Sequence, residues 1–338
     1  MTVSFANNKA IAMSYVLVMA DLIDRRGGNS EALLRKAGIR KQYGKDPLAF
    51  ITLAQYEALL RGVVESVSDP AVGLYLGKDI QFSDHGTFAY SALSFPTVWD
   101  ALKLGLKFSR LANQVVDIRL DERQEFNAVR FDTAYLSGSL YPVVIEMVMS
   151  LFCEILKFMV KDDISSIELD FSYAPPEYVE CYEEVFGAKV RFECGVNEVR
   201  IPKKLAEKPQ LMANPAIAEK VEAECDALIK KIYEPKTVAQ QIHEILFFSR
   251  RNFPQLEEMA DKINMSPRTM RRRLQESETS YKKILENVRL ELANRYLSTT
   301  RRSIGEIAEL LGYADQNSFS YAYKKLTGLS PSHYRKQL

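Results

Sequence analysis

One pattern near the end of the chain constrains its fold more than any other. The pattern of a short helix, a tight turn and a second helix occurs twice. The first copy, QLEEMADKINMSPRTMRRRL, covers residues 255–274, and the second, SIGEIAELLGYADQNSFSYAYKKL, covers residues 303–326. Each copy has an alanine midway along its first helix, Ala260 or Ala308, where another helix can cross closely. The repeat therefore predicts two similar helical pairs.

The turn of each copy contains a residue that tolerates a positive φ angle, Asn264 in the first and Gly312 in the second. Ser266 has the character of a helix N-cap, with Pro267 at the first helical position, and Asp315 fits the same capping role in the second copy. These features predict two helix-turn-helix motifs. In such motifs the second helix lies in the major groove of DNA.

The segment between the copies, residues 280–298, is expected to be a helix, because apolar side chains recur in it at helical spacing. About 18 helical residues span roughly 27 Å. Successive major-groove faces on one side of a duplex are about 34 Å apart. A single short helical pair would be weak evidence, but two pairs joined by such a helix predict binding to double-stranded DNA.

This part of the chain resembles the DNA-binding domain of the AraC/XylS family of transcription regulators. The resemblance rests on four stretches: MSPRTMRRRL (265–274), TSYKKILENVRLELANRYL (279–297), SIGEIAELLGYADQNSFSYAYKKLTG (303–328) and LSPSHYR (329–335). The chain departs from the family pattern at Asn264 and Glu278, where glycine is usual, and at Tyr321, where the second recognition helix commonly carries arginine. We therefore expect the first recognition helix to anchor specificity and the second to read bases more weakly.

Helical geometry sorts the side chains of the recognition helices. Met270, Leu274, Phe319 and Tyr323 are expected to face the protein. The side chains expected at base edges are Arg268, Arg271, Arg272, Gln316, Asn317, Ser320 and Tyr321, and the family pattern also implies such a place for the three arginines. Those expected at phosphates are Thr269, Arg273, Ser318, Lys324 and Lys325. An isolated arginine run would more simply be a solvated helix face, but the doubled motif favours DNA.

The charged residues are distributed unevenly, and the basic part of the chain is the part that contains the two motifs. The 338 residues carry a formal net charge of +1, yet residues 236–338 contain 18 Lys and Arg against 11 Asp and Glu, a net charge of +7. The remainder contains 27 basic and 33 acidic residues, a net charge of −6. A basic C-terminal third suits nucleic-acid binding by that part alone. The length predicts two domains, and a hydrophobic content of 47% is ordinary for a soluble globular protein.

Neither a metal nor any other cofactor is expected. The sequence has three histidines, no CxxC pair and four widely spaced cysteines, Cys153, Cys181, Cys194 and Cys225. Buried thiols in a reducing cytoplasm are the simplest interpretation of those cysteines. The apolar stretch 141–160 is interrupted by Glu146, Glu154 and Lys157, which fall on one side of a helix. This pattern favours a mostly buried helix over a membrane span.

The N-terminal part is expected to contain helices first and strands later. Helices are predicted over residues 10–20, 53–67, 98–110 and 140–160, and strands over 114–120, 126–132, 166–171, 189–192 and 198–201. The fold class is therefore an α+β N-terminal domain, helix-rich with a small antiparallel sheet, followed by an all-α C-terminal domain. The expected boundaries are 1–205 for effector binding and dimerisation, 206–234 for a linker with a helix, and 235–338 for DNA binding, with motifs at 255–276 and 303–327 and the connecting helix at 280–298.

Two N-terminal stretches are similar to the long effector-binding, arabinose-binding-like domain of one branch of the same family. They are FSDHGTFAYSALSFPTVWDALKLGLKFSRL (82–111) and YEEVFGAKVRFECGVNEVRIPKKL (182–205). The resemblance implies an effector-binding role and a homodimer formed by this domain, but it does not give a ligand. Our hypothesis is that a small metabolite, lipid-like or amino-acid-like, shifts the protein between DNA-competent and incompetent arrangements. Candidate effector-binding residues are His85, Phe88, Tyr90, Phe95, Trp99, Phe108 and Phe152. Plain core packing is the alternative for each aromatic, as is a backbone-bonded loop position for His85.

Common enzyme motifs are missing from the sequence, which has no GxSxG, P-loop, GxGxxG or HExxH. No cysteine has a neighbouring histidine, as a DNA-repair methyltransferase would need. The sequence therefore predicts a non-enzymatic transcription regulator, an activator that senses a small molecule and has RNA polymerase as a further partner. Two alternatives stay open: a DNA-binding protein that needs no ligand, and a DNA-binding domain fused to an unrecognised enzyme.

Overall fold

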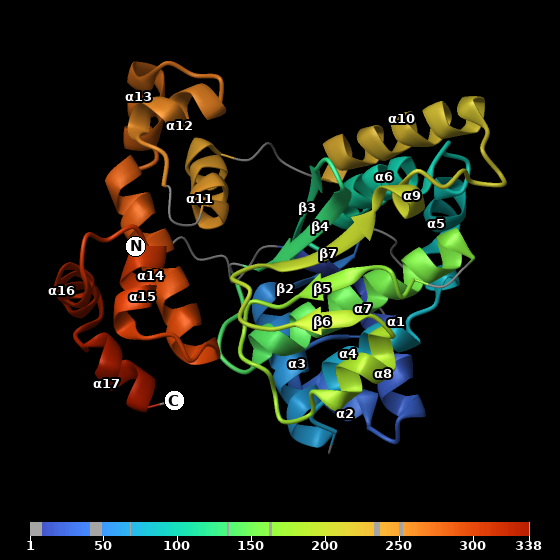
Figure 1. Ribbon diagram of the computed structural model, residues 1–338, viewed down its shortest axis with the longest axis horizontal. Helices are drawn as coiled ribbons and strands as arrows, with labels where there is room; N and C mark the ends of the chain where they lie inside the picture. Colours follow the sequence, from blue (N-terminus) through green and yellow to red (C-terminus); the bar gives the residue numbers. More distant parts are fainter. Residues whose placement is uncertain are drawn as a thin grey trace. The chain divides into compact units, whose positions relative to one another are not determined.

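The computed structural model describes residues 9–40, 49–67, 69–133, 135–161, 164–232, 237–249 and 253–337 (Figure 1). The chain divides into two compact units, Met1–Tyr233 and Glu234–Leu338. Each unit buries its own set of apolar side chains. The predicted start of the DNA-binding domain, residue 235, lies outside the described residues.

Helices make up most of the first unit. Their bounds are α1 Met13–Arg25, α2 Ser30–Lys36, α3 Leu53–Ser66, α4 Val72–Asp79, the 3-10 helix η3 Phe82–His85, α5 Gly86–Ala92, α6 Val98–Ala112, α7 Leu140–Val160, α8 Glu180–Phe186, α9 Lys203–Ala206 and α10 Pro215–Ile232. Thr52 and Thr97 begin α3 and α6, because the side-chain oxygen of each accepts a hydrogen bond from the backbone N–H of Gln55 or Asp100. The predicted helices over 53–67, 98–110 and 140–160 are confirmed to within two residues.

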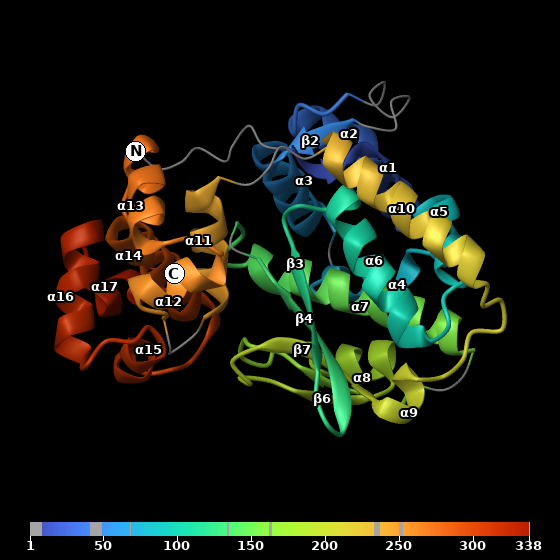
Figure 2. The ribbon, with the colours of Figure 1, turned by 90° about the horizontal axis from the view of Figure 1, so that it is seen from above.

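A five-stranded sheet completes the first unit. Its strands are β3 Asp117–Glu122, β4 Phe126–Asp132, β5 Glu168–Asp170, β6 Lys189–Arg191 and β7 Asn197–Pro202, in the order β3-β4-β7-β5-β6. The sequence predicts these five strands, but the sheet is not purely antiparallel, because β5 and β6 pair in parallel. Parallel neighbours require a crossover, and α8 provides it between these two strands. Helix α7 contacts the sheet through β4 (Figure 2).

A second, two-stranded sheet is absent from the sequence prediction. The apolar run 10–20, expected to be one helix, begins as strand β1, Lys9–Ala12, and only then becomes α1. Strand β1 pairs antiparallel with β2, Phe50–Thr52. A short apolar run has no periodicity that separates strand from helix. The partner strand, nearly forty residues further on, decides the conformation.

Helix α7 is the core of the first unit and packs most closely against α4. A Cβ atom at Gly77 would lie 2.1 Å from the carbonyl oxygen of Met147, so only glycine permits this approach. Glu154 and Lys157 lie at the half-exposed side of α7, as expected, but Glu146 is 0% exposed. The interruption at Glu146 is therefore a polar group inside the core and not part of a solvated face. No described helix has the length and apolar character needed to cross a membrane.

Residues 206–234, which the sequence analysis treats as a linker, belong largely to the first unit as far as they are described. Helix α10 packs along α6 and α5. Val221 and Cys225 of α10 are buried members of the hydrophobic core of this unit. The apolar positions of a charged helix thus find their partners within the N-terminal fold.

The described part of the second unit is all helical. Its elements are α11 Val238–Phe248, α12 Leu256–Lys262, α13 Pro267–Glu276, α14 Tyr281–Thr299, α15 Ile304–Leu310, α16 Gln316–Thr327 and α17 Pro331–Lys336. Helix α12 packs with α13, and α15 packs with α16. The long helix α14 lies between these two pairs (Figures 1 and 2). It contacts α11, α15 and α17.

Candidate DNA interface and ligand cavity

The first helix-turn-helix consists of α12 and α13. Asn264 adopts a φ of 52° in its turn, and Ser266 caps α13 by accepting a hydrogen bond from the backbone N–H of Thr269 at 3.1 Å. Met270 and Leu274 are buried, which confirms that these two positions face the protein. The exposed sides of α13 are therefore those that carry the arginines.

The second helix-turn-helix consists of α15 and α16. Gly312 adopts a φ of 70°, and the Asp315 carboxylate accepts a hydrogen bond from the backbone N–H of Ser318 at 2.7 Å. That hydrogen bond lowers the pKa of Asp315. Phe319 and Tyr323 are buried, as expected from the helical spacing. The turn and cap signals of both motifs thus produce the conformations that the sequence predicts.

The side chains expected to contact DNA are accessible. Most are exposed, namely Arg268, Arg271, Arg272, Arg273, Gln316, Asn317, Ser318, Tyr321, Lys324 and Lys325, while Thr269 and Ser320 are half-buried. Nη2 of Arg271 lies 3.5 Å from Oε1 of Glu257, and Nε of Arg272 lies 3.6 Å from Oε1 of Glu276. Exposed ion pairs of this length contribute little to the stability of the folded protein. Both guanidinium groups can therefore turn readily to another anion.

Arg289 of α14 connects the two motifs, and sequence reasoning missed it. Its guanidinium carbon lies 4.7 Å from the ring centre of Tyr313, beside the second turn, and 5.1 Å from that of Phe253, just before the first motif. Its side chain also donates to the carbonyl oxygen of Gly312 at 3.2 Å. Cation–π contacts of this kind fix the planar group between two rings. An arginine within a helix gives no sequence signal for such a role.

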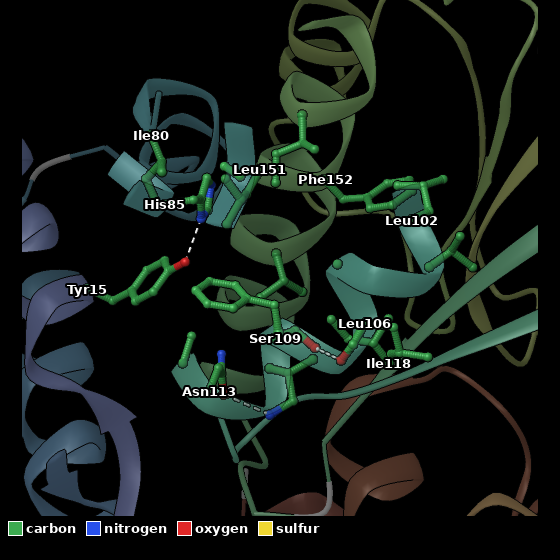
Figure 3. A pocket seen from close by; sticks show the side chains of 18 of the residues that line it. Tyr15, Ile80, His85, Leu102, Leu106, Ser109, Asn113, Ile118, Leu151 and Phe152 are labelled. Carbon is green, nitrogen blue, oxygen red and sulfur yellow. Dashed lines mark hydrogen bonds between the residues drawn. The ribbon is translucent and has the colours of Figure 1, made fainter. Parts of the chain in front are cut away.

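A cavity of about 190 Å³ lies within the first unit, between α1, α6, α7 and the strands β3 and β4 (Figure 3). Its lining is predominantly aliphatic and aromatic, with Leu102, Leu106, Ile118, Leu151 and Phe152 among the lining residues. On the order of ten water molecules could occupy this volume. A mostly apolar concave space with a few polar groups is the usual form of a small-molecule site.

The candidate effector-binding residues divide into two groups. His85, Phe108 and Phe152 line the cavity. Three others are not part of its lining: Tyr90 is exposed, Phe95 is half-buried, and Trp99 is buried with its Nε1–H donating to Glu122 at 2.7 Å. The side chain of Phe88 lies outside the described residues.

The lining also includes Tyr15 and Tyr56, which the sequence analysis did not select. They come from α1 and α3, far in sequence from the stretch that carried the resemblance, so only the fold brings them to the cavity.

Two polar side chains that line the cavity are hydrogen-bonded to each other. The Tyr15 hydroxyl forms a hydrogen bond with Nδ1 of His85, and Figure 3 shows the two side chains pointing toward one another from α1 and η3. Burial lowers the pKa of His85, against a smaller opposing effect of Asp84. Burial also raises the pKa of Tyr15. Both side chains are therefore uncharged at neutral pH. Among the described residues, no group of three or more His, Cys, Asp or Glu could hold a metal ion.

The fold and these sites define a DNA-binding regulator with a ligand-binding domain, and comparison with known proteins gives its family. Residues 27–210 match the family described as "Arabinose-binding domain of AraC transcription regulator, N-term", and residues 259–337 match "Helix-turn-helix domain". The chain belongs to the AraC family of transcription regulators, as its sequence motifs predict. Both matched domains describe regulators and not enzymes.

Several relatives are similar over most of their length. The chain is 30% identical over 329 residues to the "Ornithine utilization regulator" of Pseudomonas aeruginosa, covering 96% of each chain. It is 24% identical to the "HTH-type transcriptional regulator VirS" of Mycobacterium tuberculosis, covering 93% of each. A crystal structure of the "transcriptional regulator CdpR" from Pseudomonas aeruginosa aligns with a TM-score of 0.42 and 25% identity, covering 83% of this chain and 91% of that one.

Proposed function

We propose that this chain is a sequence-specific transcription activator whose N-terminal unit senses a small molecule and whose C-terminal unit reads DNA. The observation that supports this most is the pair of exposed, polar recognition helices, α13 and α16, with α14 between them. Helix α14 has 19 residues, which corresponds to about 28 Å. Successive major grooves on one face of a duplex are about 34 Å apart. We therefore place α13 and α16 in neighbouring grooves of the same face.

The proposed contacts follow from exposure and chemistry. Base edges are read by Arg268, Arg271 and Arg272 of α13 and by Gln316, Asn317, Ser320 and Tyr321 of α16. Phosphates are held by Thr269, Arg273, Ser318, Lys324 and Lys325. Thr269 and Ser318 lie in the first turn of their helices, where their hydroxyl groups can donate to a phosphate.

The cavity of the first unit supports the sensing half of the proposal. A ligand changes activity only if it binds one of two states of the protein more tightly than the other. The matched arabinose-binding domain supports a small-molecule effector for this cavity. Ornithine, which stands in the name of the relative from Pseudomonas aeruginosa, serves in a first test as a charged metabolite for comparison.

Three further parts of the proposal concern the setting in which the chain acts. We infer a homodimer formed by the N-terminal unit, a cytoplasmic location, and RNA polymerase as the partner at the promoter. Occupation of a single face of the duplex leaves the other faces open to the polymerase, which is compatible with activation. We propose effector binding for residues 1–205 and DNA binding for residues 235–338, while residues 206–234, first expected to be a linker, add α10 to the first unit.

Footprinting of the full chain on genomic fragments, followed by transcription in vitro, tests the function. For each bound protomer we expect two protected blocks about 10 base pairs apart, centre to centre, on one face of the DNA. Transcription from the same promoter should rise when an effector is added. The variant with Arg268→Ala and Arg272→Ala is the control and should protect nothing. Absence of any protected sequence would refute the DNA-reading half, and transcription that no metabolite changes would favour the ligand-independent alternative.

A further inference from the structure

The lining of the cavity in the first unit narrows the kind of molecule that it can hold. None of the described residues that line it is Asp, Glu, Lys or Arg. A carboxylate or an ammonium group transferred into such a space would lose its hydration without gaining an opposite charge, which is strongly unfavourable. The cavity therefore suits a molecule that is neutral and largely apolar.

Asn113, which follows α6, offers such a molecule a hydrogen-bond donor. Its Oδ1 atom accepts hydrogen bonds from the backbone N–H of Val115 at 2.8 Å and of Val116 at 3.1 Å. These bonds fix the orientation of the amide, because an NH₂ group in that place could not accept them. Nδ2 has no hydrogen-bond partner among the described residues. In Figure 3 it points away from the turn, toward the other side chains that line the cavity.

The hydrogen bond between Tyr15 and His85 provides a second donor. Because the imidazole is neutral, it carries a single N–H. Only one of the two groups donates in this hydrogen bond: in the tautomer with Nδ1 unprotonated, the Tyr15 hydroxyl donates to Nδ1. The imidazole proton then lies on Nε2, an atom that is buried and has no hydrogen-bond partner within the described part of the chain. A buried donor without an acceptor is unfavourable, and an added acceptor would relieve it.

Both donors lie at the same end of the cavity. The backbone of Asn113 pairs with that of Ile11, which is followed four residues later by Tyr15. In the view of Figure 3, Tyr15, His85 and Asn113 lie on one side of the cavity together with Ile80, and Leu102, Leu106 and Ile118 lie on the other. The donors are thus on one side of the space, and the opposite side is apolar.

We propose that the cavity binds a neutral, largely apolar molecule with one hydrogen-bond-accepting oxygen, such as a medium-chain ketone or ester. The oxygen accepts from Nδ2 of Asn113, and the hydrocarbon part lies against Leu102, Leu106 and Ile118. Nε2 of His85, which has no partner among the described residues, offers a second donor on the same side of the cavity. This ligand class rests on the proposed function, because it specifies what the sensing unit recognises.

Equilibrium dialysis of the full chain against four eight-carbon probes tests the ligand class. The probes are 2-octanone, octane, octanoate and octylammonium. We expect 2-octanone to bind most tightly, with each charged probe weaker by at least about tenfold because of uncompensated desolvation. After each affinity is corrected for the transfer of that probe from water to alkane, octane should bind more weakly than the ketone by at least about fivefold, because it cannot accept a hydrogen bond. A charged probe that binds as tightly as 2-octanone, octane that does so after this correction, or no binding of 2-octanone would overturn the proposal.

Asn113→Asp is the decisive variant. The aspartate keeps an oxygen for the N–H groups of Val115 and Val116 but replaces the donor with a carboxylate. Binding of 2-octanone should weaken by about tenfold or more, while binding of octylammonium should strengthen. Asn29→Asp is the matched control, since Asn29 accepts from the N–H of Ala32 at 2.9 Å in the cap of α2, outside the cavity lining. Unchanged selectivity in Asn113→Asp would overturn the assignment of the donor.

A second variant and the DNA assay distinguish failure of the ligand class from failure of the proposed regulatory function. His85→Phe should weaken binding of 2-octanone by about fivefold, and unchanged binding would remove His85 from the site. If Asn113→Asp does not fold, the comparison of 2-octanone with octane on the natural chain carries the same test. If 2-octanone fails to bind while another metabolite changes the footprint, the ligand class is wrong and the regulatory function stands. If the chain protects no DNA, the regulatory function fails, while dialysis still decides the ligand class.

Discussion

Tyr321 is 73% exposed in the middle of α16. By comparison with the first motif, a charged side chain that contacts bases would be expected at this position. On α13 three arginines are exposed instead. An arginine can pair with guanine through two hydrogen bonds at once, whereas a tyrosine hydroxyl makes at most one such contact in the groove. At the scale of single residues, the two motifs therefore differ in how strongly they can discriminate between bases.

Arg268→Ala is expected to weaken binding to a mapped operator by about tenfold or more, because a bidentate base contact is worth about 1–3 kcal/mol. Tyr321→Ala should weaken it less. Fluorescence anisotropy at one fixed salt concentration measures both. Both side chains are exposed, so unchanged thermal unfolding serves as the control. A larger loss for Tyr321→Ala would contradict the hypothesis that the first recognition helix anchors specificity.

Glu146 is the residue in the core whose ionisation should matter most for stability. Burial raises its pKa to about 7, although the hydroxyls of Tyr178 and Tyr182 donate hydrogen bonds to it. In the unfolded chain the same carboxyl has its ordinary pKa of 4.5, so near neutral pH the folded state holds a proton that the unfolded state has lost. Stability from this group is complete below pH 4.5 and is lost as the pH rises through about 7.

Glu146→Gln should remove this pH dependence. Between pH 4.5 and 7.5 the natural chain should lose about 3 kcal/mol of unfolding free energy relative to the variant. Urea denaturation across that pH range measures the difference. Glu154→Gln, on the half-exposed side of the same helix, is the control and should follow the natural chain. Parallel curves for the natural chain and Glu146→Gln would contradict the expectation.

At the scale of elements, α14 does more than connect the motifs. Tyr323 of α16 donates to Asn294 of α14 at 2.6 Å, and Arg289 of α14 contacts Gly312 and Tyr313 beside the second turn. These contacts hold the second motif against the helix. The guanidinium group of Arg289 also contacts the ring of Phe253, just before the first motif. We expect these contacts to fix the spacing of the two recognition helices within the C-terminal unit.

Arg289→Ala should loosen this spacing and weaken binding to DNA that contains both groove sites by about tenfold, while binding to a half-site changes little. Anisotropy titrations with the two DNAs measure the contrast. Lys282→Ala, an exposed position on the same helix, is the control. Equal losses on the full site and on the half-site would indicate a general loss of fold or charge instead.

At the scale of the whole molecule, the chain combines a basic helical unit with an α+β unit that encloses a cavity. The apolar face of α10 packs on the first unit through Val221 and Cys225, so the described chain up to Ile232 is part of that fold. A ligand in the cavity contacts α6, and α10 lies along α6. Displacement of α6 by a ligand would therefore be transmitted first to the helix that ends the N-terminal unit.

Local chemistry was sufficient to predict the DNA-binding half from sequence alone. A positive φ at Asn264 and Gly312, the caps at Ser266 and Asp315, and the inward pairs of apolar residues all follow from interactions between near neighbours in the chain. The caps at Thr52 and Thr97, where α3 and α6 begin, are local interactions of the same kind. Such features need no knowledge of distant parts of the fold.

The tertiary structure alone decided what depends on partners far apart in the sequence. The pairing of β1 with β2, the parallel register of β5 and β6, the burial of Glu146 and the bridging place of Arg289 are of this kind. So is the cavity, since Tyr15, His85 and Asn113 come from separate elements, and of the expected ligand residues whose side chains are described only three line it. Such contacts arise from packing between elements, which leaves no periodic trace in the sequence.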